Sequence, residues 1–331
     1  MSRQFRVAVV GATGLVGDTM IKVLEERGFP VSELFPLASN RSLGKSVEFR
    51  GKSHPVLELD KFDFSRADIG LFSAGSDTSR ESAPKRSAAL VETKRIGPLV
   101  VPEVNPQAVA GYKTRGIIAN PNCSTIQMVV ALKPVHDAAG IERINVATYQ
   151  SVSGAGKEAV EELASQSAAL LSGREAEAKV IAKQIAFNCV PQIDKFEANG
   201  YTREEMKMFW ETRKIMGDGS IRVNATAVRV PVFFGHSESV HIETRRKISA
   251  AEARELLEKA PGVTVLDDRV PAGYPTAATE AANHDTVYVG RIREDISHDR
   301  GLALWIVADN VRKGAATNSV QIAEILARDF L

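Results

Sequence analysis

The sequence predicts an α/β protein with two domains: a Rossmann-like dinucleotide-binding domain at the N-terminal end and a second α+β domain with a mostly antiparallel sheet. Three observations predict it. An apolar, β-branched run at residues 5–10 enters a glycine-rich turn and then a segment with helical spacing. Longer runs at residues 144–149 and 224–234 alternate in part, as antiparallel strands do. The chain has 331 residues, more than one hydrophobic core usually serves.

The first domain is predicted from a βαβ unit. After the glycine turn, Met20, Ile21, Val23 and Leu24 recur at helical spacing among charged residues, and Gly28 ends this helix. A second strand is expected at residues 34–38. Strand, turn, helix and strand in this order imply a parallel sheet. Further short apolar runs that continue the domain are residues 69–73, 99–101 and 116–119.

The second domain is expected to begin after residue 120. Its predicted helices are residues 157–171 and 203–214, and two more strands are expected at residues 287–292 and 302–307. A final helix, residues 315–330, is rich in small and apolar side chains. We therefore expect residues 1–120 to form the first domain, with the helix of 310–331 returning to it, and residues 121–309 to form the second.

Composition excludes several classes of protein. Charged residues make up 25% of the chain and the net charge is only +1, so no nucleic-acid partner is expected. No apolar run reaches the roughly 20 residues of a membrane span, and no signal peptide is predicted. The two cysteines form no disulfide framework and fit a reducing, cytoplasmic setting. No closely spaced Cys/His cluster indicates a metal site.

Gly11, Gly14 and Gly17 follow the first strand and open the first helix. In a dinucleotide turn such glycines allow the tight bend, the approach of the pyrophosphate to the backbone, and close helix packing. The phosphates then lie at the helix N-terminus. A plain tight turn is the alternative. The other residues that we assign to this cofactor site around the ends of the first strands are Thr13, Leu15, Val16, Ser73, Ala74 and Gly75.

The segment after the second strand indicates the cofactor. An acidic side chain there would bind a ribose 2′-hydroxyl, but this chain offers Ser39, Arg41 and Ser42 instead. Arginine is a fixed cation whose planar fork suits a phosphate, and the serine hydroxyls can donate hydrogen bonds. The sequence therefore predicts NADP rather than NAD. An ordinary solvated surface arginine is the alternative.

Cys123 directly follows Asn120-Pro121-Asn122 and precedes a helix-compatible run. A thiol at a helix N-terminus meets unpaired backbone N–H groups and the positive end of the helix dipole, and both favour the thiolate. The same donors can hold the oxyanion that follows attack on a carbonyl. A buried structural cysteine is the alternative. The pattern predicts a cysteine nucleophile with a lowered pKa.

A cysteine nucleophile needs an acid/base partner, which is usually histidine. Of the six histidines, His236 is the candidate, because it follows a strand at the glycine turn Gly235, and Arg229 lies in the same strand-like run. Gln150 ends another strand. The turn after it, with Ser153 and Gly154, is either a second cofactor surface or a plain helix cap.

Glu204 and Lys207 lie three residues apart on a predicted helix and therefore on one face. Without other information, the pattern favours a solvated ion pair that contributes only about 0.3–0.5 kcal/mol.

Taken together, these motifs resemble the aspartate-semialdehyde dehydrogenase family, and they occur in the family's order over almost the whole chain. The motifs are 11–17 (GATGLVG), 101–105 (VPEVN), 120–125 (NPNCST), 149–156 (YQSVSGAG), 229–232 (RVPV) with 235–238 (GHSE), and 309–316 (DNVRKGAA).

The resemblance implies reduction of L-aspartyl 4-phosphate by NADPH to aspartate semialdehyde and phosphate, in the synthesis of lysine, methionine and threonine. It implies that Cys123 is the nucleophile and His236 the acid/base. Gln150, with Asn122, belongs to the substrate site. Arg229 would hold the α-carboxylate, Glu204 the ammonium and Lys207 the phosphate. Ser153, Gly154 and Asn310 would join the cofactor contacts. A homodimer formed through the second domain is also implied.

One interval departs from the family pattern. The family places a strand and a loop with a phosphate-binding arginine before the equivalent of Pro98, and residues 86–97 are too few for both. Arg95 or Lys94 do not match the motif, so we transfer no role. The short interval leaves an inactive NADP-binding homologue open as one alternative. The other alternative is an enzyme with a related substrate, which either reduces another acyl phosphate, such as N-acetylglutamyl phosphate, or carries out a glyceraldehyde-phosphate-type oxidation.

Overall fold

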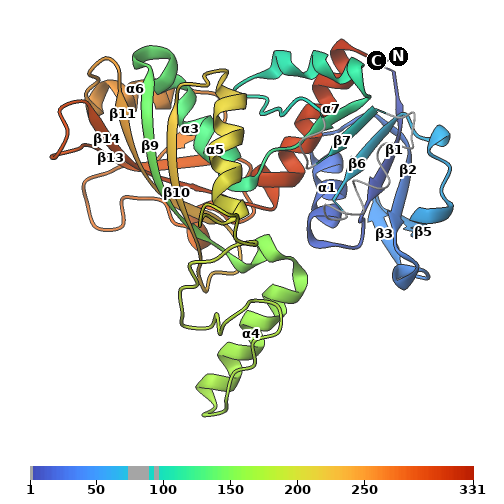
Figure 1. Ribbon diagram of the computed structural model, residues 1–331. Helices are drawn as coiled ribbons and strands as arrows, with labels where there is room; N and C mark the ends of the chain where they lie inside the picture. Colours follow the sequence, from blue (N-terminus) through green and yellow to red (C-terminus); the bar gives the residue numbers. More distant parts are fainter. Residues whose placement is uncertain (1–2, 74–88, 93–96) are drawn as a thin grey trace. The chain divides into compact units, whose positions relative to one another are not determined.

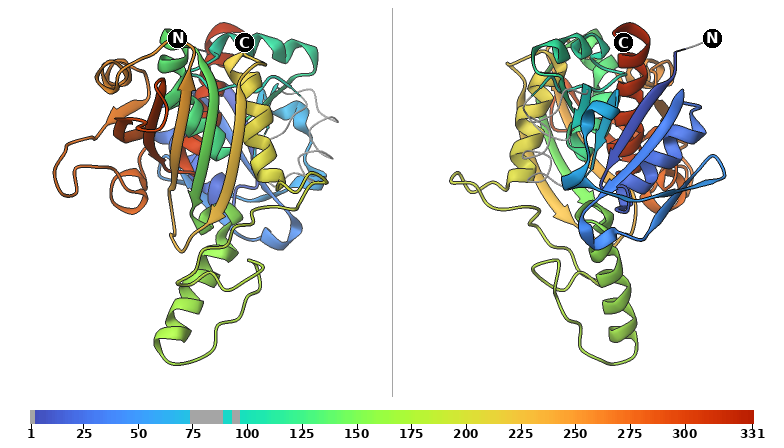
Figure 2. Two further views of the ribbon diagram at one scale, coloured as in Figure 1. Left: turned by 60° about the vertical axis from the view of Figure 1, so that its left-hand side comes forward. Right: turned by 90° about the vertical axis from the view of Figure 1, so that its right-hand side faces the viewer.

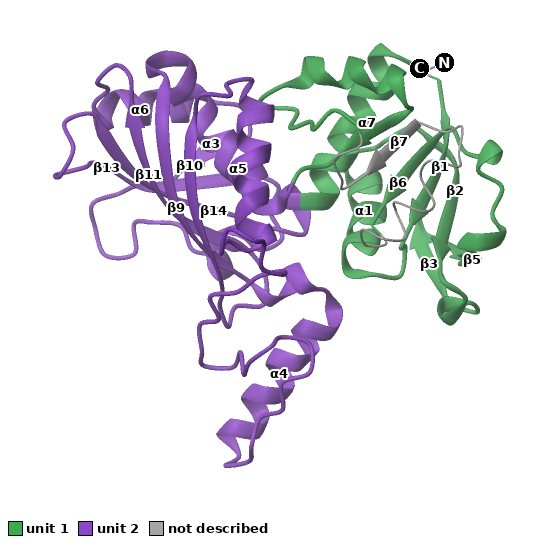
Figure 3. Cartoon of the chain, in the orientation of Figure 1, with its two compact units in different colours: residues 1–121, 315–331 green, residues 122–314 purple. Residues whose placement is uncertain are grey.

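The computed structural model describes residues 3–73, 89–92 and 97–331, with the backbone alone for residues 89–92. Its contacts divide the chain into two compact units (Figure 3). Unit 1 comprises Met1–Pro121 and Ala315–Leu331, and unit 2 comprises Asn122–Gly314. Each unit has its own six-stranded sheet (Figure 1). None of the helices in the described ranges is long and apolar enough to cross a membrane.

Unit 1 is built on a parallel sheet, because each of its strand pairs runs in the same direction. The strands in spatial order are β5 (Leu57–Glu58), β2 (Val31–Ala38), β1 (Phe5–Val10), β6 (Ile69–Phe72), β7 (Ala89–Glu92) and β8 (Ile117–Ala119). The strands β3 (Ser46–Phe49) and β4 (Lys52–Pro55) form a hairpin that is a separate two-stranded sheet. The strand order changes direction at β1, where open α/β sheets place their ligands.

The turn after β1 needs glycine for two separate reasons. Gly11 has φ of 81°, a left-handed conformation that side chains disfavour. A Cβ on Gly17 would lie 2.1 Å from the carbonyl oxygen of Gly11, so α1 (Leu15–Glu26) packs directly on the turn only with glycine there. The helix thus begins close to the end of β1.

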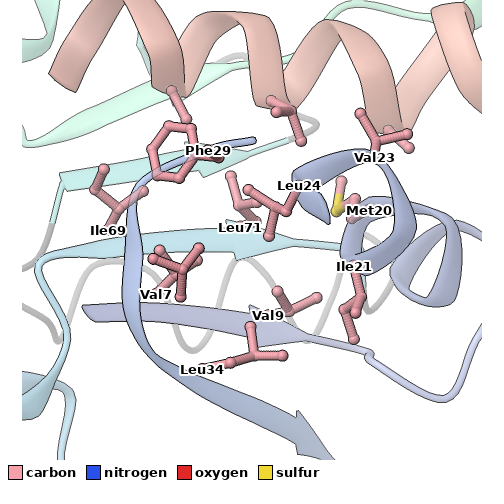
Figure 4. Packing of buried hydrophobic residues seen from close by; sticks show 14 of the residues in the cluster. Val7, Val9, Met20, Ile21, Val23, Leu24, Phe29, Leu34, Ile69 and Leu71 are labelled. Carbon is pink, nitrogen blue, oxygen red and sulfur yellow. The ribbon is translucent and has the colours of Figure 1, made fainter. Parts of the chain in front are cut away.

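The main core of unit 1 forms where α1 and the C-terminal helix α7 (Thr317–Asp329) meet one face of the sheet. Figure 4 shows side chains of β1, β6 and α1 converging, among them Val7, Val9, Ile69 and Leu71. Val320, Ala323 and Leu326 of α7 belong to the same buried cluster. The last helix of the chain therefore completes the core of the first unit.

Unit 2 is built on a mixed sheet. Its strands in spatial order are β10 (Arg222–Arg229), β9 (Ile141–Gln150), β11 (His236–Thr244), β14 (Gly301–Ala308), β13 (Val287–Glu294) and β12 (Val263–Val265). The three inner pairs are antiparallel, whereas the outer pairs β10–β9 and β12–β13 are parallel. Because β9 and β10 run parallel, their C-terminal ends lie next to each other.

The helices of unit 2 are α3 (Cys123–Ala139), α4 (Lys157–Leu171), α5 (Arg203–Met216) and α6 (Ala250–Glu258). Helix α3 packs on the inner strands and α5 on β10. Capping boxes at Thr202 and Ser249 start α5 and α6. Helix α4 extends away from the sheet of this unit in each view (Figure 2).

The predicted fold class is confirmed, and most predicted elements lie within a few residues of their expected bounds. Three differ. The strand expected at 224–234 ends at Arg229, because the chain turns there before β11 begins at His236. The run at 99–101 makes one isolated bridge, Leu99 to Ala119, instead of a strand. The interval 86–97 does contain a strand, β7, so the sheet has not lost it; residues 86–88 and 93–96 lie outside the described residues.

Candidate active site

One edge of the unit 2 sheet gathers three of the predicted site residues. Strands β9 and β10 run parallel and end at Gln150 and Arg229, which are paired in register. Strand β11 runs the other way and begins at His236, so its first residue reaches the same edge. All three side chains are buried, with exposures of 1%, 6% and 0% in that order. The topology therefore brings an amide, a guanidinium and an imidazole together.

Cys123 is the first residue of α3, as predicted. Asn122 caps this helix: its side-chain oxygen accepts hydrogen bonds from the backbone N–H groups of Ser124 (3.1 Å) and Thr125 (3.2 Å). Such a cap contributes about 1 kcal/mol. The same Asn122 donates from Nδ2 to Glu204 Oε1 at 2.7 Å. The cap thus ties the helix start that carries Cys123 to α5.

Glu204 is the centre of the charged cluster. It is only 5% exposed, so the predicted solvated ion pair is wrong for this residue. Its Oε2 accepts from Lys207 Nζ at 2.9 Å, and its Oε1 accepts from Gln150 Nε2 at 3.3 Å as well as from Asn122. Burial alone would raise the pKa of Glu204, but Lys207, Asn122 and Arg229 together hold it below its ordinary value. A buried carboxylate therefore stays ionised here.

The pKa of the Cys123 thiol differs from the lowered value that the sequence predicts. Burial, followed by the negative charge of Glu204, raises the pKa of Cys123 to about 12, although Arg229 and Lys207 act in the opposite direction. The helix N-terminus does not compensate for these two effects, so the expected lowering of the pKa is wrong for the free chain. Cys123 is half-buried and unpaired with any other cysteine. It rests as a thiol among charged neighbours.

His236 is fully buried and neutral. Burial, together with the positive charge of Arg229, lowers the pKa of His236 well below its ordinary value. Its Nδ1 accepts a hydrogen bond from the backbone N–H of Ser151 at 3.1 Å and lies 3.1 Å from Ser151 Oγ. Its Nε2 has no hydrogen-bond partner among the described residues. The ring is thus held at one nitrogen and available at the other.

Ser153, Gly154 and Asn310 lie beside this histidine. Asn310 Oδ1 accepts from Ser151 Oγ (3.0 Å), Ser153 Oγ (3.1 Å) and the backbone N–H of Gly235 (3.0 Å). A Cβ on Gly154 would lie 3.3 Å from His236 Nε2 and 2.9 Å from a guanidinium nitrogen of Arg229. Glycine at 154 therefore leaves Nε2 open. Whether these three residues also contact the cofactor stays a prediction.

The other predicted cofactor residues that the structure describes lie in unit 1 around the carboxyl ends of β1, β2 and β6. Thr13 Oγ1 and Ser42 Oγ lie 3.0 Å apart, across the turns that follow β1 and β2. Ser39 and Arg41 are exposed in the same short turn as Ser42. Ser73 donates from Oγ to the carbonyl of Val10 at 3.0 Å, next to β1. Ala74 and Gly75 lie outside the described residues.

Sequence reasoning missed four residues that touch this site. Glu211 accepts from the backbone N–H of Asn122 at 2.8 Å, and Asp194 lies 3.3 Å from Lys207 Nζ. Ser151 holds His236 as described above. A Cβ on Gly314 would lie 2.7 Å from Cys123 Cβ, so this glycine leaves room for the cysteine. Ser151 and Gly314 both fall in motifs recognised in the sequence, but nothing in the motifs shows what they touch.

Two protein-family models match the chain. Residues 6–112 match the NAD-binding domain of semialdehyde dehydrogenases, and residues 132–313 match the dimerisation domain of the same proteins. An aspartate-semialdehyde dehydrogenase of Legionella pneumophila is 62% identical, over 100% of this chain and 98% of its own length. The chain belongs to the aspartate-semialdehyde dehydrogenase family.

Solved structures of this family have the same fold. The aspartate-semialdehyde dehydrogenase II of Vibrio cholerae, complexed with ASA, superposes with a TM-score of 0.97 at 56% identity, covering 100% of both chains. The Candida albicans enzyme with NADP superposes with a TM-score of 0.73 at 26% identity, covering 98% of each chain. The resemblance predicted from the motifs is therefore confirmed.

The comparison also bears on the chain's length. The alignment with the Legionella relative extends over 340 positions, whereas this chain has 331 residues, so that relative holds residues without a counterpart here. The alignment length does not say where in the chain these residues fall, so the shortened interval at residues 86–97 stays a prediction. The residue that replaces the expected phosphate-binding arginine stays unassigned.

Proposed function

We propose that this chain reduces L-aspartyl 4-phosphate with NADPH to L-aspartate 4-semialdehyde and phosphate, through a thioester on Cys123. The observation that carries the proposal is the charge pattern around this thiol: one buried carboxylate, Glu204, beside two cations, Arg229 and Lys207. A free amino acid phosphate presents the complementary set of one ammonium and two anionic groups. The family resemblance places this reaction in the synthesis of lysine, methionine and threonine.

Each charge has a place in this proposal. The Glu204 carboxylate pairs with the substrate ammonium, and the Arg229 guanidinium pairs with its α-carboxylate, for which a planar fork is suited. Lys207, with 23% of its side chain exposed, pairs with the phosphate. Gln150 and Asn122 donate to Glu204 and orient the carboxylate. The acyl carbon is thereby presented to the sulfur.

The covalent step uses Cys123 alone as the nucleophile. Its sulfur forms a bond to the acyl carbon, and the bond from that carbon to the phosphate oxygen breaks, with the electron pair leaving on phosphate. When bound, NADPH supplies the hydride that reduces the thioester to the aldehyde level. His236, whose Nε2 has no hydrogen-bond partner among the described residues, supplies the proton balance as the acid/base: it accepts the thiol proton as the sulfur attacks and passes it to the departing phosphate. After hydride transfer the carbon–sulfur bond breaks, the aldehyde departs, and a proton from solvent, delivered through His236, returns the sulfur to the thiol form.

The unit 1 turn fits a dinucleotide on its own geometry. The closed turn at Gly11 and Gly17 exposes the N-terminus of α1 for the pyrophosphate. Arg41, next to the Thr13–Ser42 pair, suits the 2′-phosphate of NADP. We infer NADP on this basis; Arg41→Ala then raises the KM for NADPH more than the KM for NADH.

We also propose a homodimer, because the dimerisation-domain match covers residues 132–313, most of unit 2, and the sheet of this unit has one half-exposed face. On β9 the buried residues Ile144, Val146 and Thr148 alternate with the more exposed Asn145, Ala147 and Tyr149. In Figure 2, left, strands β9, β10 and β11 face the viewer. We place the enzyme in a reducing cytoplasm, since its nucleophile must stay a free thiol.

Phosphate-dependent reduction of NADP by aspartate semialdehyde tests the proposed activity, with Cys123→Ser beside the wild type. We expect activity in the wild type and its loss in the variant, with NADPH still bound. N-acetylglutamate semialdehyde, assayed in parallel, separates the alternative acyl phosphate: its acetylated nitrogen carries no charge for Glu204, so we expect no turnover. Absence of any activity would favour the inactive homologue.

A further inference from the structure

The ammonium of Lys207 has two acidic neighbours that differ in their exposure. It donates a hydrogen bond to Glu204 Oε2 at 2.9 Å, and Asp194 Oδ2 lies 3.3 Å from it. The side chain of Glu204 is 6% exposed, whereas that of Asp194 is 36% exposed. The cation therefore pairs with one buried acid and with one acid that solvent reaches.

The backbone of Asp194 directs its side chain toward this cation. Its φ is 66°, in the left-handed region that Asp and Asn tolerate better than other residues with a side chain. One carboxylate oxygen, Oδ1, accepts a hydrogen bond from the backbone N–H of Lys195 at 2.9 Å, which leaves Oδ2 for Lys207. Residues held in sparsely populated conformations cluster at functional sites. The conformation of Asp194 is therefore a reason to look for a role in ligand binding.

The chain is tied to the site on both sides of Asp194. Before it, Val190 exchanges two backbone hydrogen bonds of 2.9 Å with Arg229. After it, the carbonyl of Lys195 accepts a hydrogen bond of 2.8 Å from the backbone of the first residue of α5, the helix that carries Lys207. The fold of unit 2 thus fixes where the Asp194 carboxylate lies relative to the ammonium.

The charges around Lys207 keep it a cation. Burial opposes the charge, but Glu204, Asp194 and Glu211 raise the pKa of Lys207 above its ordinary value. In the proposed function this cation binds the substrate phosphate, so the phosphate and the acids compete for one ammonium. Glu204 and Glu211 are buried, whereas Asp194 is exposed. Asp194 is therefore the acid that a ligand from solvent displaces at the lowest cost, since its carboxylate regains water.

We propose that Asp194 is a specificity-determining residue that sets the affinity of the site for phosphate: its carboxylate pairs with Lys207 in the free enzyme and gives way to the substrate phosphate. This inference rests on the proposed function, which assigns the phosphate to Lys207. The carboxylate also repels the bound phosphate. After the acyl group has passed to Cys123, Asp194 pairs with the ammonium again and favours release of the phosphate.

Phosphorus-31 NMR of inorganic phosphate, titrated with the full-length enzyme, measures this affinity without turnover. The part of the binding that belongs to the site is the part lost in Lys207→Gln. Asp194→Asn removes the charge, keeps the size of the side chain and still tolerates the left-handed φ. We expect this variant to bind phosphate about two- to fivefold more tightly than the wild type, the effect of one partly exposed ion pair.

Glu197→Gln is the matched control for the NMR titration. Glu197 is 33% exposed and lies 3.8 Å from a guanidinium nitrogen of Arg203, also at the start of α5. We expect its phosphate affinity to equal that of the wild type. Unchanged or weaker binding in Asp194→Asn overturns the inference alone. Unchanged binding in Lys207→Gln shows instead that the phosphate does not bind at Lys207, and then the assignment in the proposed function fails as well.

Steady-state kinetics with aspartate semialdehyde, phosphate and NADP separate this role from a structural one. We expect Asp194→Asn to lower the KM for phosphate by about two- to fivefold. The KM for aspartate semialdehyde should stay the same, because the ammonium and the carboxylate of this substrate pair with Glu204 and Arg229. In the reductive direction, phosphate should inhibit the variant more strongly than the wild type. A rise of both KM values would mean that Asp194 only supports the fold, and the proposal would be wrong.

Discussion

At the scale of single residues, the carboxylate of Glu204 controls the state of the Cys123 thiol. Glu204 is buried and held ionised by Lys207, Asn122 and Arg229. Its negative charge is, after burial, the largest cause that raises the pKa of Cys123 to about 12. The free enzyme therefore protects its nucleophile from reagents. In the proposed reaction the substrate ammonium neutralises this charge, so the binding of substrate itself makes the thiolate more accessible.

Glu204→Gln should lower the pKa of Cys123, because a neutral amide of the same size removes the repulsive charge. We expect alkylation of Cys123 by iodoacetamide to begin at a lower pH in the variant than in the wild type. Cys189, which is exposed, serves as the reference thiol in the same sample and should react faster than Cys123 in the free wild type. Glu158→Gln, at an exposed position of α4, is the matched control. An unchanged pH profile in Glu204→Gln would contradict this account.

At the scale of elements, the contact of α3 with β11 contains a completely buried acid, Glu238. Glu238 is completely buried two residues after His236, and neither carboxylate oxygen has a hydrogen-bond partner in the described ranges. Gln127, one helical turn after Cys123, lies beside it and is directed at the carbonyl of His236 at 3.4 Å. Burial raises the pKa of Glu238 well above its ordinary value. The carboxyl group is therefore neutral in the folded protein.

This neutral acid predicts a pH dependence of stability. The unfolded chain releases the Glu238 proton above its ordinary pKa, near 4.3, whereas the folded chain keeps it. The folded state thus binds more protons, and the stability falls as the pH rises through the interval between the two pKa values. Glu238→Gln mimics the neutral form and removes this loss.

Urea unfolding at several pH values measures the effect. We expect the wild type and Glu238→Gln to differ little near pH 4, and the variant to gain relative stability toward neutral pH, by up to about 1.4 kcal/mol per pH unit. Glu255→Gln, at an exposed position of α6, should show no such trend. If the free energies of unfolding of Glu238→Gln and the wild type differ by the same amount at every pH, the pKa of Glu238 does not change on folding. The carboxyl group would then be ionised in the folded protein at neutral pH, and the prediction would be wrong.

The sequence predicted the elements better than the environments of their side chains. The start of α3 at Cys123 and the bounds of α4 follow from local turn and helix signals, so they could be predicted. The raised pKa of Cys123 could not, because it depends on burial and on Glu204, which are set by packing between distant segments. The same reason explains why the solvated ion pair predicted for Glu204 and Lys207 was wrong. Their spacing places both residues on one helix face, but only the packing of α5 on β10 shows that this face is buried.

At the scale of the whole molecule, composition and motif order indicated two domains and an NADP-dependent enzyme. The family and the fold class are now confirmed, whereas the roles of the site residues stay proposals. Gly314 shows why some residues escape prediction: its lack of a side chain matters only because the chain returns to within contact distance of Cys123. No pattern near Gly314 in the sequence indicates that contact.

The proposed homodimer makes a prediction about the whole assembly. Ala147 lies near the middle of β9 on the half-exposed face of the unit 2 sheet, opposite Thr226 and Ser239 on the neighbouring strands. Ala147→Glu adds a charge that water can solvate in a monomer. In a dimer through this face the charge would be buried without a partner, which costs several kcal/mol.

Sedimentation velocity over a range of concentrations measures the outcome. We expect the wild type to sediment as a dimer and Ala147→Glu to shift toward the monomer at micromolar concentration. Ser53→Glu, at an exposed position of β4 in unit 1, adds the same charge elsewhere and should leave the dimer intact. A dimer of undiminished stability in Ala147→Glu would show that the two copies associate through another surface, because a buried unpaired carboxylate at the centre of the interface is incompatible with tight association.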